Sequence, residues 1–229
     1  MPAAPSPRVL TALLVMSAVV AIGTAGAGDL RSIYWVAKPL ATFSVLALAA
    51  TAKHPVSSRY QNAVTTGLAL SLIGDVLLML PADLFAAGLG AFLLAHLCYL
   101  AAFLSESRFL ARPVALLGYA LVAAALVSAV FSGVPPALRL PVIAYVVVIT
   151  LMATQAAIWM LSAPSPNAQL AAIGAAWFLV SDATLAIDRF RTDMPFRDVI
   201  ILGTYYIAQW CIARSVERNV GREVSGASS

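Results

Sequence analysis

Long apolar stretches separated by short polar breaks follow one another along the whole chain. A bilayer core takes about 20 apolar residues per helix, and the breaks carry the Pro, Gly and charged residues typical of loops. The pattern predicts an all-α polytopic membrane protein with about eight transmembrane helices, forming a single integral membrane domain over 1–229 with a polar C-terminal tail at 218–229. The spans are expected near 9–26, 33–52, 60–80, 84–104, 113–131, 138–162, 168–188 and 198–217.

Composition supports a membrane protein and excludes other classes. The 229 residues are 62% hydrophobic and 10% charged, whereas soluble domains carry about 25% charged residues. A soluble enzyme and a disordered chain are therefore excluded. The basic residues are scattered, so the net charge of +4 does not indicate nucleic acid as a partner. Two cysteines inside apolar segments and only two histidines predict neither a disulfide nor a metal centre, and no cofactor.

The distribution of basic residues predicts the orientation in the membrane. Arg8, the apolar run after it and the small residues at 25–27 resemble a signal peptide, but we expect this segment to be retained as the first span. Both termini then share one side. That side holds Arg8, Lys53, Arg59, Arg108, Arg112, Arg214, Arg218 and Arg222, against Arg31, Arg139, Arg189, Arg191 and Arg197 on the other. The positive-inside rule places both termini in the cytoplasm, with the protein in the cell (inner) membrane.

Polar side chains inside the spans are the candidate functional groups. A carboxylate at the centre of a membrane helix costs about 2.5–3.5 kcal/mol, so it marks a functional site by default. At a rise of about 1.5 Å per residue, one layer about 8–10 Å below the non-cytoplasmic surface contains Lys38, Asp75, Tyr145, Asp182 and Tyr205. His96 and Gln209 lie roughly 17–18 Å deep. Together they predict a polar cavity that opens on the non-cytoplasmic side and has its floor near mid-bilayer.

The segments around the two aspartates resemble each other. Asp75 and Asp182 each follow a small residue, and further matches lie before and after them at the offsets of one helix face. The matched positions are Gly67, Ser71, Gly74, Asp75 and Leu78 against Gly174, Phe178, Ser181, Asp182 and Leu185. Both segments cross the membrane in the same direction, which suggests two four-helix halves with the site between them.

Structural roles are the alternative for these groups. The aspartates and Lys38 would form an ion pair that locks helices together. His96 would be a hydrogen-bonded core residue, Tyr205 an interfacial belt residue, and Gln209 a bridge between helices. Two carboxylates exceed what one structural pair requires, which favours a functional site.

Short motifs in this order resemble the YhhN-like family of integral membrane proteins, whose characterised members are lysoplasmalogenases. They are 38–40, 71–79, Phe85, Gly88, Leu89, Phe92, His96, Tyr99, Phe178, Ser181, Asp182, 185–186, 189–190, Tyr205 and Gln209. The resemblance implies an eight-helix, metal-independent hydrolase that cleaves the vinyl-ether bond of lysoplasmalogens. Its products would be a fatty aldehyde and glycerophosphoethanolamine or glycerophosphocholine.

The resemblance also implies roles for the polar residues. Asp75 and Asp182 would be catalytic, because vinyl-ether hydrolysis needs one protonated carboxylic acid and one ionised carboxylate. The sequence does not say which aspartate is the acid. The partners would be a lysophospholipid, water and the lipid bilayer; the sequence leaves the oligomeric state open. The substrate-binding residues would be Lys38, His96, Tyr99, Tyr145, Ser181, Tyr205 and Gln209.

Two other functions use the same residues. A proton-coupled transporter also needs intramembrane carboxylates, although the spans lack the paired Gly/Pro breaks of discontinuous helices. A Ser–His hydrolase would use Ser71 or Ser181 as nucleophile and His96 as base, but no nucleophile motif surrounds either serine.

Overall fold

Eight α-helices account for most of the fold, and each overlaps one of the apolar segments. The computed structural model describes residues 5–218; most of the predicted polar tail at 218–229 lies outside them. The helices are α1 (Pro7–Thr24), α2 (Arg31–Ala50), α3 (Ser58–Met79), α4 (Phe85–Glu106), α5 (Pro113–Val130), α6 (Arg139–Ser162), α7 (Pro166–Phe190) and α8 (Arg197–Arg214). Short 3₁₀ turns, η1 (Gly28–Leu30), η2 (Phe131–Gly133) and η3 (Pro136–Leu138), precede α2 and join α5 to α6.

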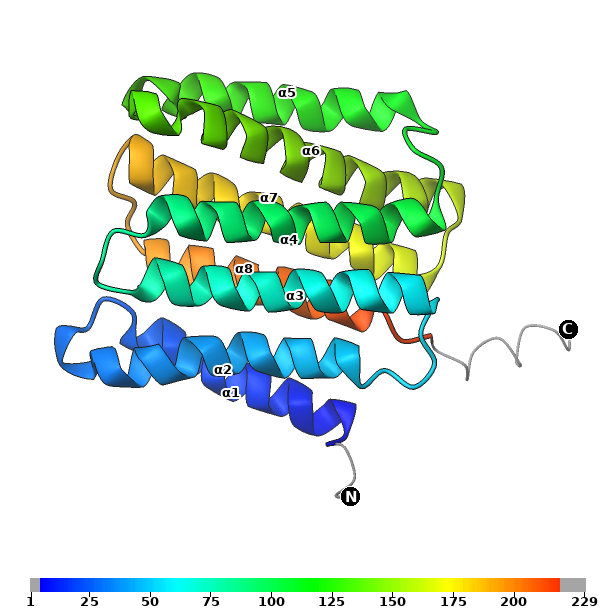
Figure 1. Ribbon diagram of the computed structural model, residues 1–229, viewed down its shortest axis with the longest axis horizontal. Coiled ribbons are helices and arrows are strands. Elements are labelled where there is room, and N and C mark those ends of the chain that lie inside the picture. Colours follow the sequence, from blue (N-terminus) through cyan, green and yellow to red (C-terminus); the bar gives the residue numbers. More distant parts are fainter. Residues whose placement is uncertain (1–4, 219–229) are drawn as a thin grey trace, which may run out of the picture.

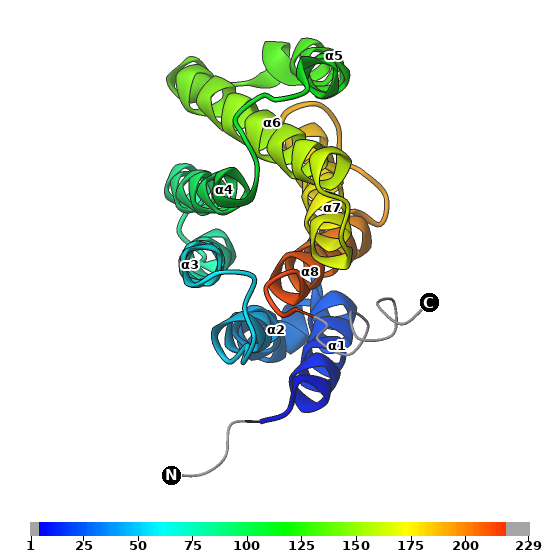
Figure 2. The same cartoon turned by 90° about the vertical axis from the view of Figure 1, so that its right-hand side faces the viewer.

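The helices run side by side in alternating directions, and α1 and α5 lie at opposite edges of the bundle (Figures 1 and 2). Within residues 5–218, seven helices are long and apolar enough to cross a membrane. The exception is α8, which carries Arg197, Asp198 and Arg214 in its 18 residues. It packs against α7, α2, α1 and α3 inside the bundle. The all-α polytopic membrane fold predicted from the sequence is confirmed.

Local sequence sets where several helices begin. Ser6, Ser57 and Ser165 each accept a hydrogen bond from the backbone N–H three residues later, at 3.4, 3.1 and 3.1 Å. Such serine caps satisfy one of the free donors of a helix N-terminus. Prolines follow at the first positions of α1, α5 and α7, where no intrahelical donor is lost. The polar breaks in the sequence therefore determine the helix starts.

The contacts between helices repeat from the first four to the last four. α1–α2, α2–α3 and α3–α4 pack together, and so do α5–α6, α6–α7 and α7–α8. Between the halves, α4 packs on α6 and α8 packs on α2. These two contacts are equivalent if α1 to α4 correspond in order to α5 to α8. Two four-helix halves would give this arrangement, and it places Asp75 on α3 and Asp182 on α7 in corresponding positions.

Two glycines in these corresponding helices allow close packing. A Cβ atom at Gly67 would overlap the ring of Tyr99 on α4. A Cβ atom at Gly174 would lie 2.8 Å from the backbone oxygen of Ala208 on α8. Small residues of this kind let membrane helices approach each other closely, and they fix α3 on α4 and α7 on α8.

We therefore expect Gly174→Ala to destabilise the protein, because the added methyl group pushes α7 away from the backbone of α8. Overpacking of this kind costs about 1–3 kcal/mol. Thermal unfolding in detergent should show a lower Tm for this variant. Gly203→Ala is the matched control, since nothing lies within 4 Å of a Cβ atom there. Equal melting temperatures for the two variants would contradict the close α7–α8 contact.

The C-terminal end of α8 is tied to the loop between α2 and α3. An isolated antiparallel bridge joins Pro55 and Glu217. The Glu217 carboxylate accepts hydrogen bonds from the backbone N–H groups of Lys53 and His54 at 2.7 and 3.1 Å. The Asn167 side chain donates to the backbone oxygens of Ser215 and Glu217. These contacts hold α8 in place at the end of the bundle that carries both termini.

Candidate active site

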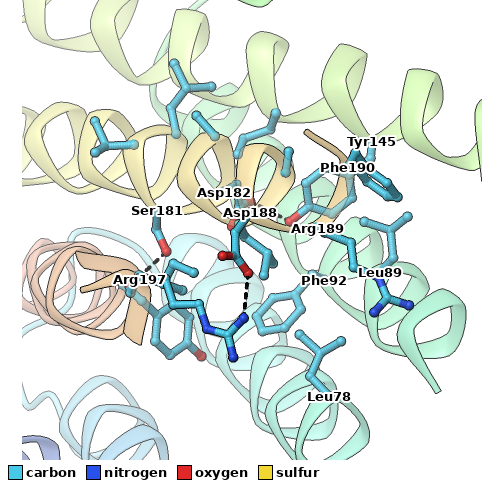
Figure 3. A pocket seen from close by; sticks show the side chains of 18 of the residues that line it. Leu78, Leu89, Phe92, Tyr145, Ser181, Asp182, Asp188, Arg189, Phe190 and Arg197 are labelled. Atoms are coloured by element: carbon cyan, nitrogen blue, oxygen red, sulfur yellow. Dashed lines mark hydrogen bonds and ion pairs between the residues drawn. The ribbon is translucent and has the colours of Figure 1, made fainter. Parts of the chain in front are cut away.

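A cavity of about 450 Å³ opens among the helices at the end of the bundle opposite the termini. Its lining comes from the first turns of α2, α4, α6 and α8 and from the last turns of α3, α5 and α7. Most lining side chains are apolar, among them Leu78, Leu89 and Phe92 (Figure 3). The polar and charged lining residues are Tyr34, Lys38, Asp75, Tyr145, Ser181, Asp182, Asp188, Arg189, Arg197, Asp198 and Tyr205. A volume of this size falls in the range of small-molecule sites.

Asp75 is held by three side chains on two neighbouring helices. Lys38 on α2 places its Nζ atom 3.3 Å from Oδ1. The hydroxyls of Thr42 on α2 and Tyr205 on α8 each donate a hydrogen bond of 2.6 Å to Oδ2. The side chains of Lys38 and Asp75 are only 7% and 3% exposed. A buried carboxylate with a cation and two donors has the partners that its ionised form needs.

A chain of hydrogen bonds continues from Tyr205 into the core. The Gln209 Nε2 atom donates to the Tyr205 hydroxyl at 3.1 Å, and the Tyr99 hydroxyl donates to Gln209 Oε1 at 2.9 Å. Ser71 lies 3.2 Å from the Tyr99 hydroxyl. These fully buried groups satisfy one another, so the chain fixes the position of the Tyr205 hydroxyl on Asp75.

Asp182 has different neighbours. The Tyr145 hydroxyl on α6 donates a 2.5 Å hydrogen bond to Oδ2 (Figure 3). His96 on α4 places Nε2 3.9 Å from the same oxygen. Within residues 5–218, neither ring nitrogen of His96 has a hydrogen-bond partner, and its ring packs edge-on against Phe178 and Tyr145. Asp182 has no lysine or arginine within salt-bridge distance in the described part of the chain.

The two carboxylates therefore line one cavity in unequal environments. Lys38 compensates the charge of Asp75. Among residues 5–218, the basic side chain nearest to Asp182 within salt-bridge distance is His96, at 3.9 Å. Two carboxyl groups, one of them beside a lysine, thus face the same cavity. General acid–base chemistry uses one group as proton donor and a second as proton acceptor.

The nine residues singled out from the sequence fall into two groups. Lining the cavity are Lys38, Asp75, Tyr145, Ser181, Asp182 and Tyr205. Behind that lining lie His96, Tyr99 and Gln209, all fully buried. The depth estimate placed His96 and Gln209 at the cavity floor, but both are fully buried and neither lines the cavity. His96 packs against the lining residue Tyr145, Gln209 donates to the lining residue Tyr205, and Tyr99 donates to Gln209.

Sequence reasoning missed Thr42 and Tyr34, which both belong to the surroundings of Lys38. Thr42 donates to Asp75, and the Lys38 Nζ atom lies 5.9 Å from the centre of the Tyr34 ring. Their spacing of four residues on either side of Lys38 is the signal that finds them, because positions i and i+4 share a helix face.

Neither serine that the sequence offered as a nucleophile contacts His96. Ser71 is paired with Tyr99, and the Ser181 hydroxyl donates to the backbone oxygen of Ile201 at 3.0 Å. The structure therefore contains no Ser–His pair at these positions. No cluster of three His, Cys, Asp or Glu side chains that would suit a metal ion is found among residues 5–218.

Comparison with known proteins identifies the family. The profile of the YhhN family matches residues 33–216. The chain belongs to the YhhN family. The matched range contains all nine candidate residues, from Lys38 to Gln209, and it leaves out α1.

Relatives in this family include proteins named as enzymes. The chain is 33% identical over 158 residues to the mouse lysoplasmalogenase TMEM86B, covering 67% of this chain and 63% of the mouse protein. It is 35% identical over 191 residues to a Mycobacterium bovis lysoplasmalogenase, covering 80% of this chain and 70% of that protein. It is 29% identical over 185 residues to the Escherichia coli membrane protein YhhN, covering 80% and 86%. No solved structure matches the fold at a significant level.

Proposed function

We propose that this protein is a membrane-embedded hydrolase that cleaves the vinyl-ether bond of lysoplasmalogens. The products are a fatty aldehyde and glycerophosphoethanolamine or glycerophosphocholine. The observation that carries the proposal is a pair of carboxyl groups lining one cavity, the buried Asp75 with a lysine beside it and the partly buried Asp182. The names of the mouse and mycobacterial relatives support the same substrate class.

The unequal surroundings support a division of roles. Asp182 is the proton donor, because no lysine or arginine among residues 5–218 pairs with it and Tyr145 donates to one of its two oxygens. Asp75 remains ionised beside Lys38. It stabilises a developing positive charge across the cavity and orients a water molecule.

Each step of the reaction conserves atoms and charge. The Asp182 carboxyl proton moves to the outer alkene carbon, which leaves an oxocarbenium ion at the carbon bonded to oxygen. Water adds to that carbon, and its released proton passes to a carboxylate. The resulting hemiacetal breaks its bond to the glycerol oxygen, giving the aldehyde and the free glycerol hydroxyl. Side chains and water suffice for these steps, so we expect EDTA to leave the rate unchanged.

The remaining candidate residues act on these groups. Tyr145 and Tyr205 hold the two carboxyl groups in place, while Tyr99 and Gln209 hold Tyr205. His96 lies behind Asp182, with Nε2 3.9 Å from Oδ2, and packs edge-on against Tyr145. The apolar side chains of Leu78, Leu89 and Phe92 give the hydrocarbon chain a surface to pack on.

An assay with purified protein tests the proposal. Incubation with a lysoplasmalogen should release fatty aldehyde, whereas the matching acyl lysophospholipid should release no fatty acid. Covalent labelling of a serine by a fluorophosphonate would instead support a Ser–His hydrolase. Accumulation of substrate inside proteoliposomes without aldehyde release would instead support a proton-coupled transporter.

We also propose that both termini face the cytoplasm and that the cavity opens on the opposite face, as the excess of basic residues near the termini indicates. In a background lacking Cys98 and Cys211, Ser6→Cys should resist an impermeant thiol reagent added to intact cells. Asp193→Cys, in the loop between α7 and α8, should react with it. The reverse labelling pattern would indicate the opposite topology, with the cavity mouth on the cytoplasmic side.

A further inference from the structure

Charged side chains of both signs form the mouth of the cavity. Arg189 and Asp188 lie at the end of α7, and Arg197 and Asp198 lie at the start of α8. All four line the cavity. The sequence analysis counted the arginines only among the charges that set the orientation in the membrane. The proposed hydrolysis gives them no role. Two arginines and two aspartates make this rim electrically neutral as a group.

Arg197 pairs with two aspartates at the mouth of the cavity. Its Nη1 atom lies 3.2 Å from Asp188 Oδ2, and its Nε atom lies 3.9 Å from Asp198 Oδ1. Asp188 in turn accepts a 3.0 Å hydrogen bond from the backbone N–H of Met194 through Oδ1. Figure 3 shows the Arg197 side chain extending to Asp188. A guanidinium has five N–H donors, so one close bond to Asp188 leaves donors for a ligand.

Arg189 contacts an aromatic ring and one exposed aspartate. Its guanidinium lies over the Phe85 ring at 4.8 Å from the ring centre. Its Nη2 atom donates to both oxygens of Asp83 at 3.2 and 3.1 Å. The Asp83 side chain is 75% exposed, and exposed ion pairs contribute little to stability. An anionic ligand in the cavity mouth can therefore replace Asp83 at low cost.

The distance between the rim and the carboxyl groups suits a glycerophospholipid. Arg189 follows Asp182 by seven residues on α7, which is a rise of about 10 Å. Arg197 precedes Tyr205 by eight residues on α8, about 12 Å. In a lysoplasmalogen, five bonds separate the ether oxygen from phosphorus, and the long arginine side chains shorten the remaining gap. A lipid with its ether bond near the aspartates thus places its phosphate at the arginines.

We propose that this rim is a binding site for the zwitterionic head group of a lysophospholipid. Arg189 and Arg197 bind the phosphodiester through charge-assisted hydrogen bonds, and Asp198 faces the ammonium group. The inference rests on the proposed function for its substrate class, yet it concerns binding rather than bond cleavage. A polar anchor at the mouth and an apolar cavity beyond it fix the depth to which the lipid enters.

The test measures binding of lipids that cannot be hydrolysed. The probes are 1-O-hexadecyl-glycerophosphocholine, which has a saturated ether, and 1-O-hexadecylglycerol, which lacks the phosphate. Full-length protein in detergent should bind the first at least about 10-fold more tightly than the second. Arg189→Gln and Arg197→Gln should each reduce this preference about 10-fold. Arg191→Gln is the control, because Arg191 is exposed and does not line the cavity.

Two further arms make the result decisive. Free glycerophosphocholine should compete weakly; competition as strong as that of the lipid would overturn a lipid site in favour of a soluble phosphodiester. Arg197→Lys keeps a charge but has fewer donors, so it should retain part of the preference if Arg197→Gln does not fold. Equal binding of the two probes by the wild type, or an equal loss in Arg191→Gln, would overturn the proposal. These binding results do not depend on aldehyde release, so failure of the head-group site and failure of the proposed hydrolase activity are distinguishable.

Discussion

Asparagine in place of Asp182 should abolish nearly all release of fatty aldehyde while leaving the protein folded. Asparagine keeps the size of the side chain and still accepts the hydrogen bond from Tyr145, but it has no proton to give to the alkene carbon. General acid–base groups contribute about 10²–10⁴-fold to a rate. Asp75→Asn should lose activity in the same range, because it removes the negative charge opposite the oxocarbenium ion. Initial rates of aldehyde formation measure both effects.

The control for these variants is Asp193→Asn, which changes an exposed loop carboxylate away from the cavity lining. Its rate should equal that of the wild type, and melting temperatures identify variants that have lost the fold. The double variant of Asp75 and Asp182 should be scarcely slower than either single one, because the two groups act as a unit. If either single variant keeps more than about a tenth of the wild-type rate, its loss is well below the expected range. That aspartate would then have a structural role.

The fold was predictable because the membrane simplifies the pattern. Each helix must satisfy its own backbone groups in lipid, so apolar length and polar breaks locate the helices directly. The least typical helix is α8, since Gln209 is fully buried among other helices and Arg197 lies at the exposed mouth of the cavity. Its composition reflects its place beside α7 and α2, which a single sequence does not display.

The candidate site was predictable in its members but not in their pairing. Depth estimates brought Lys38, Asp75 and Asp182 into one layer, because a helix advances by a constant rise. They did not reveal which aspartate Lys38 contacts, since that depends on how α2 is rotated against α3. The covering of His96 and Gln209 also depends on neighbouring rings, which depth alone does not describe. The sequence did not indicate the charged rim at Arg189 and Arg197, because a single sequence does not show which loop charges lie at the cavity mouth.

Methionine in place of Lys38 should destabilise the protein severely, because it leaves the Asp75 carboxylate buried without its cation. Lys38 and Asp75 are 3.3 Å apart and almost fully buried. Removing one partner of such a pair typically costs about 3–5 kcal/mol, which thermal unfolding in detergent will register as a large fall in Tm. Lys53→Met is the control, since Lys53 is an exposed loop residue at the other end of the bundle. An unchanged Tm for Lys38→Met would show that the pair does not form.

Combining Lys38→Met with Asp75→Asn should recover much of the lost stability, because neither variant side chain is charged. The remaining donors, Thr42 and Tyr205, still find an acceptor in the asparagine oxygen. We expect the double variant to stay inactive, since no ionised carboxylate then faces Asp182. This outcome separates the two interpretations of the pair. A double variant that is stable and also releases aldehyde at the wild-type rate would make Lys38–Asp75 a purely structural lock, and Asp182 alone would carry the chemistry.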